Sequence, residues 1–243
     1  MKLSYDAIWQ DMVAMMKAHA EIILVVAGVF LFLPMLAQSF YLPPPVMERF
    51  DLPSMQALVA YYQDNLIALL GLRLLTLLGA GTLLALFLSP DRPTVGGAIG
   101  FAGRMLPSLF FLTLVTQFLM MGGLALFIVP GLYVAARTSV SDAAMIAEGR
   151  TSPFGAVARS FELTRGIGWQ IFGLVAIIWT VMWIASSATV AVIGIASHLL
   201  LPEDAANIAR AMLAAVSPTV IPLAFVLLSA ALYRQLSYAR SGI

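Results

Sequence analysis

Charged residues divide the chain into long apolar intervals, and several of these match the roughly 20 residues that a helix needs to cross a membrane. The first interval ends at the rigid triplet Pro43-Pro44-Pro45, and the second ends at Ser89-Pro90-Asp91, which is a turn signal. The pattern predicts membrane-spanning helices over about 22–42, 66–88, 106–129, 169–198 and 211–234.

Residues 131–148 have the length of a span but contain Arg137, Asp142 and several Ser and Thr residues. If this interval crosses, only Arg49 and Arg210 lie outside. The basic residues inside are then Lys2, Lys17, Arg92, Arg104, Arg150, Arg159, Arg165, Arg234 and Arg240. If it does not cross, the basic residues are split about equally between the two sides. The positive-inside rule therefore predicts six spans, with both termini in the cytoplasm.

Two stretches outside the spans carry apolar residues at helical spacing on one side only. In residues 1–21 this side includes Trp9, and charged residues occupy the other side. The stretch is either a helix in the cytoplasmic interface or a helix packed on the bundle or on a partner chain. In residues 153–165, Phe161 lies on the apolar face and Arg159 on the polar face, which predicts a second cytoplasmic amphipathic helix.

Composition supports a membrane protein, because 61% of the residues are hydrophobic and only 10% are charged, against about 25% in soluble domains. The predicted fold class is an all-α integral membrane protein. We expect an N-terminal interfacial helix over 1–21 and a single transmembrane domain over 22–243, a bundle of six helices with short cytoplasmic amphipathic helices. The net charge of +1 excludes a polybasic nucleic-acid binder, and the lack of Cys excludes thiolate chemistry and disulfides.

Ionisable residues inside the predicted spans are the main candidates for function, because an unpaired charge in lipid is costly. Arg73, Arg137 and Asp142 lie at membrane depth, and Glu148 lies on the same stripe of helix 131–148 as Arg137. Arg73 is a reasonable salt-bridge partner for Asp142. These residues either form a buried ion pair that fixes the helix register, or use Arg73 or Arg137 to bind the phosphate or carboxylate of an amphiphile.

Known catalytic patterns do not occur in the sequence. Its two histidines, His19 and His198, fall near opposite ends of spans, so a His-rich metal site is not expected within one chain. Walker A, Gly-x-Ser-x-Gly and His-Glu-x-x-His patterns are missing. We therefore expect no catalytic residues, no metal site and no cofactor.

A combination of small, polar and charged residues lies between 128 and 169. Ile128-Val-Pro-Gly-Leu-Tyr-Val-Ala-Ala-Arg137 is followed by Glu148 and by Ser152-Pro-Phe-Gly-Ala-Val-Ala-Arg-Ser-Phe-Glu-Leu-Thr-Arg-Gly-Ile-Gly-Trp169. This combination resembles the bacterial glycerophosphoryl diester phosphodiesterase membrane-domain family and related uncharacterised inner-membrane proteins. The matching residues are Pro130, Gly131, Arg137, Glu148, Ala156, Arg159, Ser160, Leu163, Thr164 and Gly166.

The resemblance implies a multi-spanning protein of the bacterial inner membrane with a role in lipid or envelope homeostasis. Some relatives carry a soluble phosphodiesterase domain, but its His and acidic metal ligands have no counterparts in this sequence. The resemblance therefore does not imply hydrolase activity.

The predicted function is that of a non-enzymatic membrane protein that binds lipids or a protein partner. Arg159, Ser160 and Arg165 are candidate contacts to anionic headgroups or to a partner. The protein partner could also be a second copy of the chain in a homo-oligomer, and no nucleic-acid partner is expected.

The alternative function is that of a small transporter or permease-like subunit. It would use a polar path along 131–148 and the helix break at Pro130-Gly131. Gly122-Gly123, in the span before this break, is expected to allow close helix packing.

Overall fold

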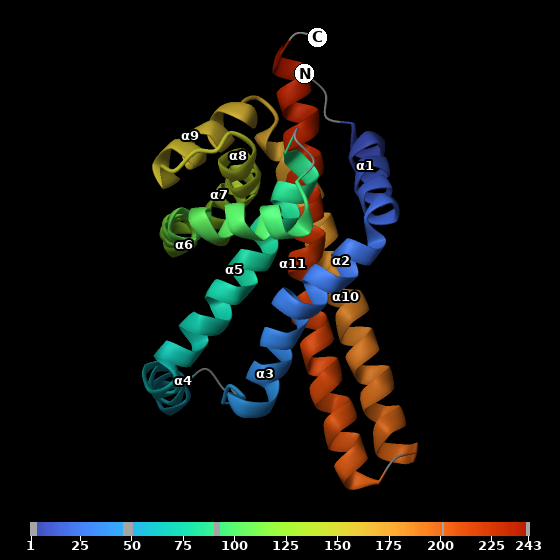
Figure 1. Ribbon diagram of the computed structural model, residues 1–243. Helices are drawn as coiled ribbons and strands as arrows, with labels where there is room; N and C mark the ends of the chain where they lie inside the picture. Colours follow the sequence, from blue (N-terminus) through green and yellow to red (C-terminus); the bar gives the residue numbers. More distant parts are fainter. Residues whose placement is uncertain (1–3, 46–50, 90–92, 201, 242–243) are drawn as a thin grey trace.

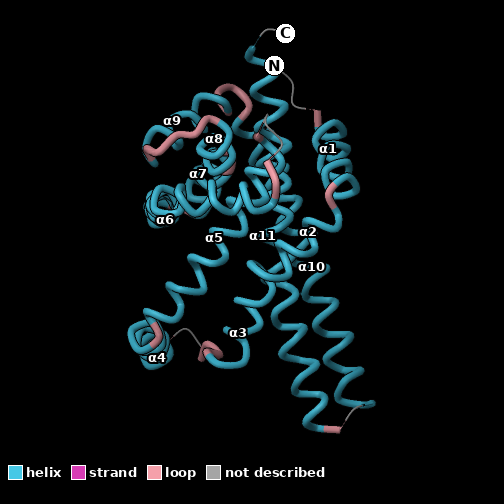
Figure 2. Tube along the Cα trace, viewed as in Figure 1, coloured by secondary structure: helices cyan, strands magenta, loops and turns pink. Residues whose placement is uncertain are grey.

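A computed structural model describes residues 4–45, 51–89, 93–200 and 202–241, and every regular element within these ranges is a helix (Figures 1 and 2). The helices are α1 (Tyr5–Ala18), α2 (Ala20–Ala27), the π-helical turn η1 (Gly28–Phe32), α3 (Leu33–Tyr41), α4 (Leu52–Asp64), α5 (Leu66–Leu88), α6 (Val95–Leu126), α7 (Ile128–Thr138), α8 (Ser141–Ala147), α9 (Pro153–Leu163), α10 (Gly168–Leu200) and α11 (Glu203–Ser241). Lys2, Arg49, Arg92 and the Pro90-Asp91 turn lie outside the described residues, as do the side chains of His198, Arg210 and Arg240.

The first apolar segment contains a wider π-helical turn between α2 and α3. Pro34, at the start of α3, has no backbone N–H and cannot donate to the preceding helical turn. The π-helical turn at η1 comes directly before it and locally changes the hydrogen-bond pattern, so the helix continues past the proline. The segment as a whole runs over Ala20–Tyr41, close to the predicted span at 22–42.

The amphipathic helix α1 packs its apolar side on the C-terminal part of α11. Ile8 and Met12 are buried in the common core, and Asp11 forms an ion pair with Arg234 of α11 at 3.0 Å. Trp9, which the pattern assigned to the apolar side, does not share this packing and is 63% exposed. Packing on the bundle, one of the two alternatives that the pattern left open, is therefore what the structure shows for this apolar side.

The single helix expected over 131–148 is not formed. The chain instead makes α7 and α8, with a turn at Ser139 and Val140 between them. Ser139 Oγ donates to the Ala136 carbonyl at 2.8 Å, and Ser141 Oγ donates to the Thr138 carbonyl at 2.6 Å. Such hydrogen bonds compete with helix propagation, so the Ser and Thr residues that made this interval ambiguous also surround its break.

Five helical segments in the described part of the chain are long and apolar enough to cross a membrane, instead of the six predicted. They are Ala20–Tyr41, Leu66–Leu88, Val95–Leu126, Gly168–Ala196 and Pro218–Tyr238. The helices α7, α8 and α9 are too short for a crossing, with 11, 7 and 11 residues. The fold is that of a multi-pass helical membrane protein.

The long helices do not all run in one direction. In Figure 1, α5, α10 and α11 run up and down the page, whereas α6 runs across them and is seen end-on only near its label. The start of α1, the end of α11, α8 and α9 lie at the upper end. The lower end holds α4 and the point where α10 and α11 meet. Helix α6, although apolar enough to be a span, is therefore oriented differently from the others.

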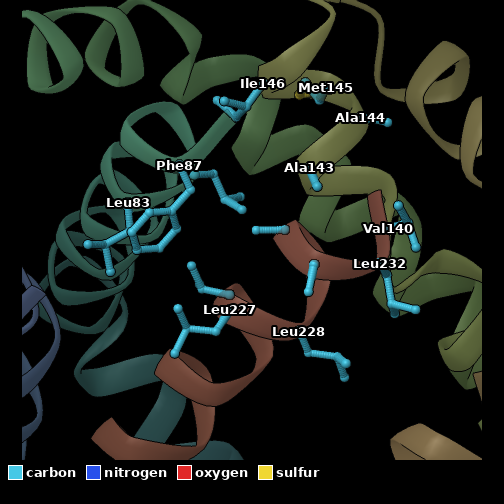
Figure 3. Packing of buried hydrophobic residues seen from close by; sticks show 14 of the residues in the cluster. Leu83, Phe87, Val140, Ala143, Ala144, Met145, Ile146, Leu227, Leu228 and Leu232 are labelled. Atoms are coloured by element: carbon cyan, nitrogen blue, oxygen red, sulfur yellow. The ribbon is translucent and has the colours of Figure 1, made fainter. Parts of the chain in front are cut away.

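The core of the protein forms around the second half of α11. Leu227, Leu228 and Leu232 of this helix are at most 2% exposed and pack with Leu83 of α5 and Ala143 of α8 (Figure 3). Helix α11 therefore lies at the centre, and α8 joins the core through its apolar residues.

Candidate functional site

Four of the seven charged or polar candidates belong to the network of hydrogen bonds and ion pairs among α7, α8 and α9. They are Arg137, Glu148, Arg159 and Ser160. The other three lie apart from this network, with Arg73 on α5, Asp142 on α8 and Arg165 just after α9.

Arg137, near the end of α7, is surrounded by acceptors. Its Nε donates to Thr164 Oγ1 at 2.7 Å, its Nη2 to the Phe161 carbonyl at 2.6 Å, and its Nη1 to Tyr133 Oη at 3.3 Å. The guanidinium also lies 4.7 Å from the centroid of the Phe161 ring. Each of its three nitrogen atoms thus has a protein acceptor, so the geometry supports the structural interpretation, in which Arg137 holds α7 on α9.

Small and hydroxyl-bearing residues of the 128–169 motif enclose this arginine. Ser160 Oγ donates to the Arg137 carbonyl at 2.7 Å, and Ser160 and Thr164 are fully buried. Gly168 lies so close that an added Cβ would be 2.8 Å from Arg137 Cδ. Gly166 has a φ of 84°, a backbone conformation that favours glycine, at the turn between α9 and α10. The motif therefore describes a packing arrangement in this chain.

Glu148, directly after α8, joins three parts of the chain. It accepts a hydrogen bond from Arg159 Nε of α9 at 2.8 Å and from Tyr233 Oη of α11 at 3.2 Å, and it pairs with Arg150. Arg159 also pairs with Glu162 at 2.9 Å. Burial tends to raise the pKa of Glu148, but hydrogen bonds from Arg159 and Arg150 outweigh this effect and hold the pKa below its usual value of 4.5.

Protonation of Glu148 is expected to weaken the fold at acidic pH. Because its pKa is lower in the folded state, the Glu148 contribution to stability is present above about pH 4.5 and is lost as the pH falls through the folded-state pKa. We expect the difference in the free energy of unfolding between the wild type and Glu148→Gln to shrink over this range in detergent. Glu162→Gln, at a more exposed carboxylate, is the control and should show a weaker trend. A Glu148→Gln difference that does not change with pH would contradict the prediction.

Adjacent residues of α11 connect this network to α1 and α5. Tyr233 reaches Glu148, whereas Arg234 pairs with Asp11 of α1 and donates to the Phe87 carbonyl at 2.6 Å. Phe87 lies in the last turn of α5, where carbonyls lack partners within the helix. One turn of α11 thereby fixes α1, α5 and the segment after α8.

Arg73 and Asp142 occupy open positions on neighbouring helices. Neither forms a direct ion pair in the part of the chain that the structure describes, so the expected salt bridge between them is not observed. Asp142 keeps an exposed surface although its neighbours in α8 are buried. Crowding by protein atoms raises the pKa of its carboxyl to about 6, and the positive charge of Arg73 acts in the opposite direction. The two charges therefore influence each other without contact.

The predicted helix break at Pro130-Gly131 is a point of close backbone contact. Helix α7 folds back on α6, and a Cβ added at Gly123 would lie 2.7 Å from the Gly131 Cα. Gly122 has nothing within 4 Å of such a Cβ. Of the Gly122-Gly123 pair, Gly123 is therefore the residue that permits the close packing expected from the sequence.

The three residues predicted to contact headgroups differ in accessibility. Ser160 is fully buried, and Arg159 is engaged by Glu148 and Glu162. Arg165 is exposed and forms no ion pair within the described residues. Only Arg165 of the three is thus free to meet a headgroup in this conformation.

Several residues of the network had not been predicted. Tyr133 lies four residues before Arg137, and this spacing on a helix would have indicated their contact. Arg234 and Asp11 are 223 residues apart, and no local pattern connects them. Groups of three or more His, Asp or Glu side chains that could hold a metal ion are not found in the described ranges.

Comparison with known proteins gives no relative for this chain. No family model, no curated protein and no solved structure matches it. The resemblance of residues 128–169 to the membrane-domain family therefore stays a prediction from the motif.

Proposed function

We propose that the protein is a non-enzymatic membrane protein that binds phospholipid headgroups through Arg73. One observation carries this proposal. Arg73 is the only charged residue of α5, it is exposed, and it has no hydrogen bond or ion pair among the residues described. An arginine in an apolar span is costly without a partner, and on a lipid-facing side the available partner is a lipid phosphate.

The chemistry of the two open residues favours a particular headgroup. A planar guanidinium can donate two parallel hydrogen bonds to a phosphate. Asp142 places a negative charge near Arg73, which suits an ammonium group on the same headgroup. A headgroup of the phosphatidylethanolamine type carries both charges. Arg137, the other arginine considered, already donates from each of its three nitrogen atoms to acceptors within the protein.

The cellular setting of the proposal rests on the resemblance. The residues that match the inner-membrane family hold α7, α8 and α9 together, and α8 in turn presents Asp142 near Arg73. We therefore place the protein in the bacterial inner membrane, in lipid or envelope homeostasis, with lipid as its main partner.

Native mass spectrometry of the detergent-purified protein tests the site. We expect the wild type to retain phospholipid and Arg73→Gln to lower its affinity for phosphatidylethanolamine by roughly tenfold, which corresponds to about 1.4 kcal/mol. This is near the lower end of what a hydrogen bond to a charged group contributes. Asp142→Asn should shift the retained lipid from phosphatidylethanolamine toward phosphatidylglycerol.

Arg104→Gln is the matched control, because Arg104 of α6 is also exposed and forms no ion pair in the described part of the chain. Retention should be nearly unchanged in this variant. An equal loss in both variants would indicate general attraction of the basic protein for anionic lipid. Full retention in Arg73→Gln would contradict the site itself.

The transport alternative loses its main support from the sequence. The polar path was expected along a membrane-crossing segment over 131–148, and the chain forms α7 and α8 there, each too short to cross. A surface groove between α10 and α11 is lined mostly by apolar residues, among them Met182, Val190 and Val220. We therefore favour lipid binding over transport.

A further inference from the structure

The number of apolar helices does not agree with the positions of the chain ends. Five crossings would place the start of α1 and the end of α11 on opposite sides of a membrane. The two lie side by side, since Asp11 pairs with Arg234 at 3.0 Å. Tyr5 Oη donates to the Gln170 carbonyl at 3.3 Å, so α10 begins at this same end. Either one of the five helices does not cross, or a sixth crossing exists.

The helix that fails to cross is identified by direction. The α2 to α3 segment runs down from this end, α5 returns to it, α10 leaves it and α11 returns (Figure 1). Helices α6 and α7 run across these four and stay level with the upper halves of α10 and α11 (Figure 1). They do not reach the level of α4. The chain between α5 and α10 therefore begins and ends at the same side.

Helices α6 and α7 form a helical hairpin, and α7, its second helix, is too short for a separate crossing. Helix α7 has 11 residues and is about 16 Å long, roughly half of the 30 Å hydrocarbon core of a bilayer. Gly123 and Gly131 close the hairpin by backbone contact. The two helices thus form one unit, and they insert into the membrane together.

The tip of the hairpin is suited to lipid tails and not to water. Residues 124–130 are all exposed and all apolar, with Phe127 77% exposed, and no charged residue occurs from 105 to 136. An exposed apolar surface of this kind marks a membrane or protein contact. Basic residues in and beside α9, namely Arg150, Arg159 and Arg165, lie at the end where the hairpin starts, whereas α4 at the other end contains none. By the positive-inside rule the hairpin belongs to the cytoplasmic half of the bilayer.

We infer that the uncharged stretch of α6 and α7, residues 105–136, forms a hairpin embedded among the acyl chains of the cytoplasmic leaflet only. The chain then crosses the membrane four times, by the α2 to α3 segment, α5, α10 and α11. Both ends stay in the cytoplasm, so the basic residues remain on the same sides as in the six-span arrangement. This inference is independent of headgroup binding at Arg73.

Single cysteines test the topology cleanly, because the chain has none of its own. Ile128→Cys reports on the tip, Phe154→Cys on α9 and Gln63→Cys on α4, and all three positions are exposed. A charged maleimide applied to inverted vesicles should label only Phe154→Cys, and in spheroplasts only Gln63→Cys. Ile128→Cys should resist it in both preparations. A bimane attached at Ile128→Cys in phosphatidylcholine vesicles should be quenched by lipids with a nitroxide on the acyl chain.

Three outcomes would overturn the inference. Labelling of Ile128→Cys in spheroplasts would show that α6 crosses completely. Labelling in inverted vesicles at the rate of Phe154→Cys would place the tip in cytoplasmic water. Protection from maleimide without quenching by acyl-chain nitroxides would show that protein, such as a second copy of the chain, covers the tip.

Discussion

Replacing Arg137 by alanine is expected to lower the free energy of unfolding by about 3 kcal/mol, because hydrogen bonds from a charged group contribute about 1.5–3 kcal/mol each and are partly replaced by solvent. The substitution removes the donors to Thr164, to Tyr133 and to the Phe161 carbonyl. It also removes the cation that lies over the Phe161 ring. The measurement is unfolding in mixed micelles as the fraction of denaturing detergent rises.

Arg150→Ala is the control for this prediction. The Arg150 side chain is 45% exposed and, among the described residues, pairs only with Glu148; exposed ion pairs contribute about 0–1 kcal/mol. Arg137→Lys should recover less than half of the loss, since an ammonium cannot reproduce the planar set of donors. Equal stability of Arg137→Ala and Arg150→Ala would show that Arg137 does not hold α7 on α9. The folded fraction of Arg137→Ala should retain as much lipid as the wild type.

Replacing Gly123 by alanine is expected to lower the free energy of unfolding by about 1–3 kcal/mol, the usual cost of adding atoms to a closely packed contact. The new Cβ would lie 2.7 Å from the Gly131 Cα and 2.9 Å from its backbone nitrogen. Backbone atoms cannot rotate away as a side chain can, so α6 and α7 must separate. The same detergent titration measures the loss.

The adjacent glycine provides the control for this second substitution. Gly122→Ala meets nothing within 4 Å, and alanine favours a helix over glycine by about 1 kcal/mol. It should therefore leave stability unchanged or raise it slightly. A loss of stability in both variants would point to a general intolerance of this part of α6, and no loss in either would show that the contact with Gly131 is loose.

Elements with clear boundary signals were predicted well from the sequence. The interval 66–88 corresponds to α5 at both ends, because Ser89 and the proline after it end the apolar run. The amphipathic helix at 153–165 corresponds to α9, where Ser152 caps the first turn and Pro153 begins it. Prolines and polar caps act locally, so a single sequence is enough to recognise them.

The interval 131–148 shows where this reasoning fails. Length and mean hydropathy describe a whole window, whereas the break between α7 and α8 depends on where Ser139 and Ser141 donate. Helix α4 was missed for another reason. It has no buried residue and only a weak amphipathic pattern, although Asp51 caps its first turn through a hydrogen bond from the Ser54 backbone N–H at 2.9 Å.

The candidate site was predicted in part. Scarcity of charge in apolar segments directed attention to Arg73 and Arg137, but it did not distinguish a residue with partners from one without. That distinction depends on Thr164 and Phe161, which approach Arg137 only after α9 packs on α7. Contacts between distant segments, such as Tyr233 with Glu148, leave no periodic signal in one sequence.

The central position of α11 has a consequence for biosynthesis. Every other helix described in this chain leaves the ribosome before α11, yet Leu227, Leu228 and Leu232 fill the core among them. Until α11 inserts, the carbonyl of Phe87 and the carboxylate of Asp11 have no Arg234 to meet. The earlier helices therefore cannot complete their packing before α11 inserts.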